Sequence, residues 1–513
     1  MSDTPPLPQD VVGYMQSMRL NEDQENVDAA IQGLKLIVAL EKEQSLVPAE
    51  EGAKEPQDLI SALHYILAKL DHDISNWVDA ILHNEDFQKL EATWLGLHHL
   101  VFNTDTSPSL KLRVLDVTEK ELRDDLARAI DFDQSALFKM VYEEEYGTLG
   151  GKPYGLLVGD FGFDRSKPSQ DFLRNIAQVA TAAHAPFIAA AHPKLFDLES
   201  FQDLPKPRDL AKIFESEEMS PWNAFRAQEE SRYVALTLPR VLMRLPYDLV
   251  DNPVDGVTYT EYTRSVSRPK ATAEASADEA AAPDRSDPRP EKYLWGNPAW
   301  FLAQRITNAF SLYGWTAAIR GVEGGGKVED LPISKFLTPA GEKAFIIPTE
   351  VSITDRREKE LSDLGFMALV YCKGANYAAF FGGQTVNKPE GYVATDARDN
   401  ASLSARLPYI LNTSRFAHYI KVMMREQIGS FMTKENVQSY LTRWISDFVL
   451  DKDDAGPELK AKYPLRDARI DVTDIPGQPG SYNATVFLRP HFQLEGLTAS
   501  LRLVAKLPAA AAA

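Results

Sequence analysis

The stretch closest to a catalytic motif reads RGVEGGGKVED and spans residues 320–330. Gly321, Gly326 and Lys327 fit the pattern G-x-x-x-x-G-K, in which backbone amides and a lysine bind the phosphates of a nucleotide. The next position, where that site needs a hydroxyl to ligate Mg²⁺, is Val328. The acids and the proline that follow suit neither a long helix nor an anion. We interpret the loop as a structural turn, because glycine permits backbone conformations that other residues resist. A nucleotide-binding hydrolase that uses this loop is the alternative function.

The other residue types offer little for catalysis. The chain has nine histidines and one cysteine, Cys372, which lies in an apolar strand-like stretch where a thiol is usually buried and inert. His98 and His99 are neighbours, so on a helix they point about 100° apart and cannot hold one metal ion together. The acidic residues 451–458 lack the glycine and the closing glutamate of a calcium loop. We expect no catalytic residue, metal or cofactor, and favour a role in assembly.

Composition limits the partners and the compartment. The 55 basic and 74 acidic side chains among 513 residues give a net charge of −19, which disfavours nucleic acid and anionic membrane surfaces as partners. One cysteine cannot form an internal disulfide, and the sequence has no charged-then-apolar leader, so we expect a protein kept in a reducing cytosol. No apolar run approaches the ~20 residues that span a bilayer, so we expect no membrane insertion.

The first hundred residues predict amphipathic helices. The first segment is short, lies between a proline-rich tail and a charged stretch, and has an apolar stripe of Val11, Val12, Met15 and Met18. It is either a docking helix for another protein or a helix packed on its own domain. We interpret a longer run as an ordinary core helix, because its apolar residues recur at helical spacing: Leu63, Leu67, Leu70, Ile74, Trp77 and Ile81.

Beyond residue 110 the pattern predicts strands mixed with helices. Residues 110–117 alternate like a strand, and residues 154–163 read as a buried one. Residues 232–247 are extended but contain prolines, which predict a position outside the central ladder of a sheet. Residues 271–292, made of Ala, Pro, Ser and charged residues, predict a disordered surface insertion. The alternation of helical and strand-like segments indicates a mixed α/β architecture.

The C-terminal third contains a basic helix and a run of strands. A long helix after Pro408 carries Arg415, Lys421 and Arg425 in a chain that is acidic overall. After residue 470 the pattern predicts two or three long strands followed by an alanine tail. A chain that ends in long strands can donate them to neighbouring subunits.

Motifs along nearly the whole chain resemble those of one family. In order, they include EYGTLGGKPYGLLVGDFGFD, SRYVALTLPRVLMRLPYD, YGWTAAIRGVEGGGKVEDLP, PTEVSITDRRE, ARLPYILNTSRFAHYIKVMMREQIG and LRPHFQLEGL. These motifs resemble the large contractile-sheath subunit of the bacterial type VI secretion system, the TssC or VipB family. The main departure is the insertion at residues 271–292, a place where relatives are shorter.

The resemblance implies a phage-tail-sheath-like fold with a helical N-terminal region and C-terminal strands exchanged between subunits. It also implies a structural role with an obligate partner, the small subunit TssB (VipA). The two subunits would polymerise around the Hcp tube, contract to propel tube and spike into a target cell, and be disassembled by the ATPase ClpV. Baseplate components and other copies of the chain in a helical array are further expected partners. A head-to-tail interface that does not close into a ring generates such a filament.

Three partner-binding regions follow from these expectations. We predict that ClpV recognises the apolar stripe of Val11, Val12, Met15 and Met18. We predict that a basic helix edge faces the tube, since local positive charge complements an acidic surface; it consists of Arg415, Lys421 and Arg425. The inter-subunit strands, residues 482–492 and 497–507, would contribute Tyr482, Val486, Leu488, Leu501 and Leu503.

We accordingly predict five parts along the chain. They are an N-terminal helical segment for ATPase recognition (1–50), a helical region with the first strand (56–135), an α/β sheath core that contains the insertion (136–470), inter-subunit strands (471–508) and a disordered tail (509–513).

Overall fold

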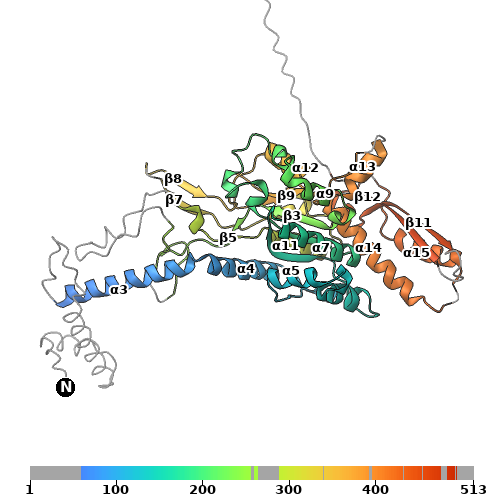
Figure 1. Cartoon of the computed structure of the whole chain (residues 1–513), viewed down its shortest axis with the longest axis horizontal. Helices are drawn as coiled ribbons and strands as arrows, with labels where there is room; N and C mark the ends of the chain where they lie inside the picture. Colours follow the sequence, from blue (N-terminus) through green and yellow to red (C-terminus); the bar gives the residue numbers. More distant parts are fainter. Residues whose placement is uncertain are drawn as a thin grey trace, which may run out of the picture. The chain divides into compact units, whose positions relative to one another are not determined.

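The computed structural model of the chain describes residues 59–255, 259–263, 288–338, 340–391, 395–430, 432–452, 454–474, 482–491 and 493. The chain divides into two compact units, residues 1–74 with 269–282 and residues 75–268 with 283–513. Of the first unit, the structure describes residues 59–74, which belong to helix α3 (Leu59–Leu82). The second unit contains the described sheets and the helices that follow α3 (Figure 1).

A six-stranded mixed sheet lies at the centre of the second unit. In spatial order its strands are β1 (Leu157–Phe163), β2 (Phe187–Ala191), β3 (Val234–Leu238), β9 (Phe366–Tyr371), β10 (Ala378–Phe380) and β6 (Lys327–Val328). The first four are parallel, and β10 is antiparallel to both β9 and β6. β3 is central and buried along its whole length. The prediction that prolines exclude residues 232–247 from the central ladder is therefore wrong, because Pro239 comes just after the last residue of the strand.

Helices pack around this sheet, and further strand pairs lie beside it (Figure 1). In chain order the described α-helices after α3 are α4 (Glu85–Phe102), α5 (Glu119–Arg128), α6 (Ala136–Phe138), α7 (Lys167–Ala183), α8 (Ala211–Phe214), α9 (Ser220–Arg226), α11 (Ala299–Tyr313), α12 (Asp355–Asp363), α13 (Thr395–Ser404), α14 (Leu407–Glu426), α15 (Lys434–Ser446) and α16 (Pro457–Lys462). Three antiparallel pairs complete the strands: β4 (Val241–Leu242) with β5 (Trp295–Gly296), β7 (Ser334–Leu337) with β8 (Lys343–Ile346), and β11 (Leu465–Asp474) with β12 (Tyr482–Pro490).

Alternate residues of the central strands point into two hydrophobic clusters on opposite faces of the sheet. The first cluster contains Phe187 and Phe366 together with residues of α5, α7, α9 and α12. The second contains Ile188 and Met367 together with residues of α11, the end of α4 and the start of α14. Both faces are thus covered by helices, as a parallel sheet requires. The expected mixed α/β architecture is confirmed.

A third cluster joins the C-terminal elements. Residues of α14, α15 and the β11–β12 hairpin bury Phe416, Leu441, Ile445 and Val472 around Trp315. β11 and β12 pair along their lengths, from Leu465 opposite Pro490 to Asp474 opposite Tyr482.

Two segments differ from their predicted structures. Residues 110–117 were predicted to be a strand. In the structure they contain no turn, but they form no β-pairing with any described residue. The predicted insertion extends to residue 292, yet its end is folded: residues Pro290–Lys292 form a short helical turn, and the Arg289 amide donates to the Thr263 carbonyl over 2.8 Å. Residues 271–287 lie outside the described residues.

Candidate assembly surfaces

Helix α3 presents its apolar side chains to solvent. Five of them are between 44% and 70% exposed: Leu67, Leu70, Ile74, Trp77 and Ile81. We call these five residues the α3 seam. Their spacing alternates between three and four residues, which is the heptad pattern by which helices pack against each other. The predicted helix is confirmed, but its interpretation as core is wrong, because the seam stays uncovered in the part of the chain that the structure describes.

Helix α4 is anchored to the body on one side and apolar on the other. The side chain of Asn84 caps its first turn. Gly96 lets α4 approach α11 closely, since a Cβ at this position would overlap the ring of Trp300. Leu90 and Trp94 on α4 remain 55% and 63% exposed. The two consecutive helices thus offer exposed apolar side chains of the kind that a partner helix would cover.

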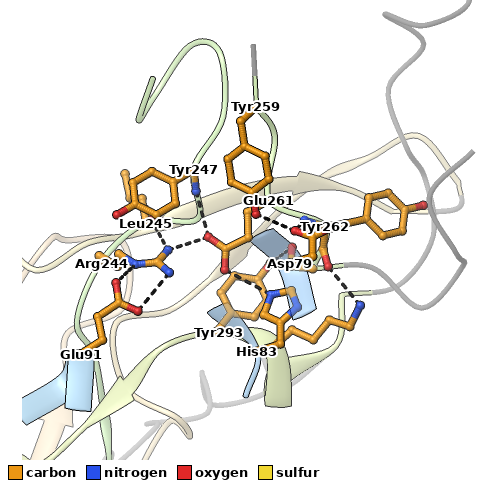
Figure 2. Close-up of polar contacts among 12 residues, drawn as sticks. Asp79, His83, Glu91, Arg244, Leu245, Tyr247, Tyr259, Glu261, Tyr262 and Tyr293 are labelled. Atoms are coloured by element: carbon orange, nitrogen blue, oxygen red, sulfur yellow. Dashed lines mark hydrogen bonds and ion pairs between the residues drawn. The ribbon is translucent and has the colours of Figure 1, made fainter. Parts of the chain in front are cut away.

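A buried network of charges fixes the junction between α3 and α4, and we call it the junction clamp (Figure 2). The Arg244 guanidinium bridges two carboxylates: its Nε lies 2.5 Å from Glu91 of α4, and its Nη1 lies 2.6 Å from Glu261. His83, which follows α3, lies 3.2 Å from the other oxygen of Glu261. Asp79 of α3 accepts hydrogen bonds from the Tyr259 hydroxyl (2.6 Å) and the Tyr262 amide (3.2 Å). The clamp therefore holds the end of α3 against residues 259–263.

The buried carboxylate of the clamp, Glu261, is held in its charged form. The side chain of Glu261 is only 2% exposed. Burial acts to raise its pKa, but the hydrogen bond from His83 and the charge and hydrogen bond of Arg244 outweigh burial and hold the pKa of Glu261 below its ordinary value. A buried carboxylate of this kind is tolerated only when it is paired. Sequence patterns gave no sign of the clamp, because its members come from segments up to about 180 residues apart.

The predicted tube-facing cations of α14 all have partners within the chain. The Arg415 guanidinium stacks 4.2 Å from the ring centre of Phe310 and donates to the Tyr419 hydroxyl over 2.6 Å. The Lys421 ammonium lies 3.2 Å from the ring centre of Tyr146. Arg425 donates to the carbonyls of Tyr146 and Thr148 over 2.9 and 2.8 Å.

These contacts show that the three cations of α14 stabilise the packing of the chain itself. Lys421 and Arg425 attach α14 to the segment Lys139–Tyr146, whereas Arg415 packs on Phe310 of α11. Burial lowers the pKa of both Lys421 and Arg415. Tyr419 and Val422 are the exposed apolar residues beside them. Tube contact by Arg415, Lys421 and Arg425 stays a prediction, and any test of it must separate loss of these internal contacts from loss of charge.

The β11–β12 hairpin packs one face against α15, and within the described residues the outer edge of β12 and most of that of β11 have no strand partner. Tyr482, Val486 and Leu488 of β12 pack against the third cluster, so their side chains point into the protein. Phe487 on the opposite face is 54% exposed. Among the described residues, β12 pairs only with β11. The hairpin thus offers backbone edges, which is the requirement for adding a strand from another chain. Leu501 and Leu503 lie outside the described residues.

Gln493 fixes the chain after the hairpin. Its side-chain amide donates to the Ala317 carbonyl over 2.9 Å, and its backbone amide donates to the Tyr409 hydroxyl over 3.4 Å. The remainder of the predicted inter-subunit segment therefore starts from an anchored point on the body.

The glycine loop is built differently from a phosphate-binding loop. Lys327 begins strand β6, whereas the phosphate site needs a helix at this point. The Gly326 amide donates to Gly321 O (2.8 Å), and the Gly321 amide donates to Phe380 O (2.7 Å), so two loop amides already have internal acceptors. The Lys327 ammonium pairs with Glu329 and lies 4.6 Å from the ring centre of Tyr377. This geometry supports the structural interpretation of the loop.

We predict that the loop depends on Gly325 and not on Lys327. Gly325 has φ of +90°, and a Cβ there would collide with the Ala318 carbonyl, so Gly325→Val should lower the free energy of unfolding by at least about 1–3 kcal/mol. Gly324→Val is the matched control, since a Cβ there meets open space. Lys327→Ala should leave the melting temperature and partner binding nearly unchanged. ATP turnover that disappears in Lys327→Ala would contradict this prediction.

Several expected features concern residues beyond the described part. The stripe of Val11, Val12, Met15 and Met18 lies outside it. Within the described residues, no helix is both long and apolar enough to cross a membrane, and no group of three or more His, Cys, Asp or Glu side chains is placed to hold a metal ion.

An exposed helix seam, an open-edged hairpin and a packed α/β body define an assembly subunit. Two family models match the chain: the EvpB/VC_A0108 tail sheath N-terminal domain over residues 64–387, and the EvpB/VC_A0108 tail sheath gpW/gp25-like domain over residues 396–507. The chain is also 43% identical over 501 residues to the type VI secretion system sheath protein TssC1 of Pseudomonas aeruginosa PAO1, which covers 96% of this chain and 95% of that relative. The chain belongs to this tail sheath family, as its motifs indicated.

Among solved structures, the chain has distant similarity to components of other contractile systems. A chain of the anti-feeding prophage baseplate matches with a TM-score of 0.35 and 10% identity over 66% of each chain. A chain of the contracted sheath of an extracellular contractile injection system matches with a TM-score of 0.34 and 8% identity, covering 65% of this chain and 68% of that one.

Proposed function

We propose that the chain is the large structural subunit of a type VI secretion contractile sheath. It pairs with the small subunit TssB, the heterodimers stack in a helical array around the Hcp tube, and contraction drives the tube and spike outward. Baseplate components start the array, which forms in the bacterial cytoplasm. The role is structural and not catalytic.

The observation that carries this proposal is the uncovered α3 seam. Fully burying a large apolar side chain contributes about 1.5–3 kcal/mol, so five such residues are a liability for a chain that acts alone. A helix with heptad spacing is covered by another helix. The junction clamp holds the base of α3, so the seam is offered from a fixed end. An obligate helical partner explains both features.

The test is co-expression of the chain with its small subunit. Negative-stain images and sedimentation of the purified complex should reveal tubular sheaths. A monomer in both measurements, with the small subunit failing to co-purify, would rule the proposal out.

We predict that charge reversal at Arg425 weakens tube assembly more than subunit pairing. Arg425→Glu removes two internal hydrogen bonds and also adds negative charge facing an acidic tube. Arg425→Ala is the matched control, because it removes the same two bonds without adding negative charge. Co-sedimentation of Hcp with the sheath should fall clearly further for Arg425→Glu than for Arg425→Ala. Equal losses would mean that Arg425 acts only inside the chain.

We predict that the stripe of Val11, Val12, Met15 and Met18 is the recognition helix for ClpV. Methionine offers an adaptable apolar contact, and a helix in a groove is read at such positions. Met15→Asp should leave assembly and the first contraction intact while contracted sheaths persist in the presence of ATPase. Ser17→Asp, which adds the same charge off the stripe, should be disassembled normally. Failure of Met15→Asp to assemble would show the helix to be structural.

A further inference from the structure

Residues 111–117 form a surface segment of the second unit that pairs with no strand among the described residues. Their backbone N–H and C=O groups make no hydrogen bond with any described residue. Both ends are nevertheless fixed. A turn with reciprocal backbone bonds joins Ser107 and Leu110 before the segment, and a capping box between Thr118 and Glu121 begins α5 directly after it. The segment is therefore fixed at both ends, while its backbone groups have no partner among the described residues.

The segment passes around one edge of the central sheet. Leu112 packs against the second cluster and Val117 against the first, and these clusters lie on opposite faces of the sheet. Arg113 donates to the hydroxyl of Tyr154 over 3.1 Å, just before β1 begins at Leu157. The edge concerned is thus that of β1, which among the described strands pairs only with β2. An open strand edge is a ready template for another chain.

The same segment also carries exposed apolar side chains and a lysine close to another lysine. Val114 is 67% exposed and Leu115 is 50% exposed. The nearby Lys152 side chain lowers the pKa of Lys111. The nearby carboxylate of Glu145 is already engaged by Arg113 and by the Lys152 amide. An additional carboxylate from another chain would relieve the repulsion between the two lysines.

We propose that residues 111–117 pair with an extended segment of the small sheath subunit of the same heterodimer. That segment adds a strand by backbone hydrogen bonds, covers Val114 and Leu115 with apolar side chains, and places an acidic side chain near Lys111 and Lys152. The inference rests on the proposed function, since it assigns one contact of that heterodimer.

A second copy of this chain is the poorer occupant. Two copies paired through the same segment, antiparallel about Val114, would set Lys111 opposite Val117 and bring no acid to the lysines. Such a contact is also two-fold and closed, so it cannot propagate along a polar helical array. One acidic strand contributed by the small subunit would satisfy both the charge requirement and the polar symmetry of the array.

Hydrogen exchange on the full-length complex tests the pairing. Among the described residues of this chain, none supplies an acceptor for the amides of residues 111–117, so the exchange of these amides is compared between the isolated chain and the complex, and protection that appears only in the complex comes from another chain. A paired edge strand bonds through alternate residues. We therefore expect alternate amides in this segment to exchange at least ~100-fold more slowly than unstructured ones. Exchange of all seven at the unprotected rate in an assembled complex overturns the inference and leaves the proposed function intact. Failure of the wild-type chains to form any complex refutes the proposed function instead.

Proline scanning tests whether the backbone makes the contact. Because alternate amides face the partner, one of Val114→Pro and Leu115→Pro must remove a ladder donor. That variant should weaken heterodimer formation at least ~10-fold, with unchanged circular dichroism of the body. Val114→Thr and Leu115→Thr keep the donors and should change affinity by less than about threefold. Equal effects of the proline and threonine variants would contradict strand addition.

Cross-linking identifies the occupant. Cys372 is the only cysteine, so Val114→Cys in a Cys372→Ser background carries a photo-cross-linker at one site. We expect a covalent product with the small subunit. A product with another copy of this chain, or none in an assembled sheath, overturns the assignment.

Discussion

A chain that ends after Gln493 should pair with the small subunit but form no sheath. It keeps β12, which covers the third cluster, and the anchor of Gln493 on Ala317 and Tyr409. It lacks residues 494–513, which contain the predicted inter-subunit strand at 497–507. Without that strand, the open edges of neighbouring hairpins have nothing to bind. Negative-stain images should contain no tubes, while size-exclusion chromatography should still give the heterodimer.

Two other truncated chains serve as comparisons for this experiment. A chain that ends after residue 508 loses only the alanine tail and should assemble like the full chain. A cut after Gly480 is a poorer test than the cut after Gln493, because it also removes β12. Loss of Val486 and Leu488 would uncover the third cluster and unfold the hairpin region. Full-length, contractile sheaths from the chain ending at Gln493 would refute strand exchange by the C-terminal segment.

Aspartate in the α3 seam should abolish pairing with the small subunit. Trp77 and Ile81 are 70% and 56% exposed in this chain, so Trp77→Asp and Ile81→Asp should leave the melting temperature of the body nearly unchanged. In a complex, each would bury an unpaired charge. Loss of one central aromatic contact alone costs about 2 kcal/mol or more, which is roughly 30-fold in the dissociation constant. The double variant should therefore give no detectable heterodimer in a pull-down.

The control for the seam is Asn76→Asp. Asn76 is exposed on the same helix but lies off the heptad positions, so this variant adds the same charge without touching the seam. It should pair normally. If it disrupts pairing as strongly as Trp77→Asp, the effect is one of net charge. If neither disrupts pairing, another surface holds the small subunit and the observation that carries the proposed function is lost.

Local periodicity was sufficient to predict individual elements. The apolar spacing from Leu63 to Ile81 predicted helix α3, and the pattern after Pro408 predicted the long helix α14. The continuous apolar stretch ending at Phe163 predicted strand β1. These predictions succeed because the period of a helix or a strand is a property of neighbouring residues. The order of the motifs along the chain was likewise enough to predict the family.

The environment of each element was not predictable in this way. The α3 seam has the same spacing whether it is buried or exposed, and only the absence of a covering element in the described fold decides the matter. β3 is central despite Pro239, because the strand ends one residue earlier. Residues 110–117 alternate as a strand should, yet a strand needs a partner, and pairing is decided by segments distant in sequence.

The contacts and burial of the charged side chains depended most strongly on tertiary structure. From the sequence, Arg415, Lys421 and Arg425 were three cations in an acidic chain, whereas in the fold they bind aromatic rings and carbonyls of residues more than about 100 positions away. The junction clamp likewise joins Arg244 to Glu91 and Glu261 through the packing of α4 and residues 259–263. Sequence order determines which elements form and which family the chain joins. Which charges are buried, and which apolar faces remain open for partners, depends on long-range contacts that local patterns do not contain.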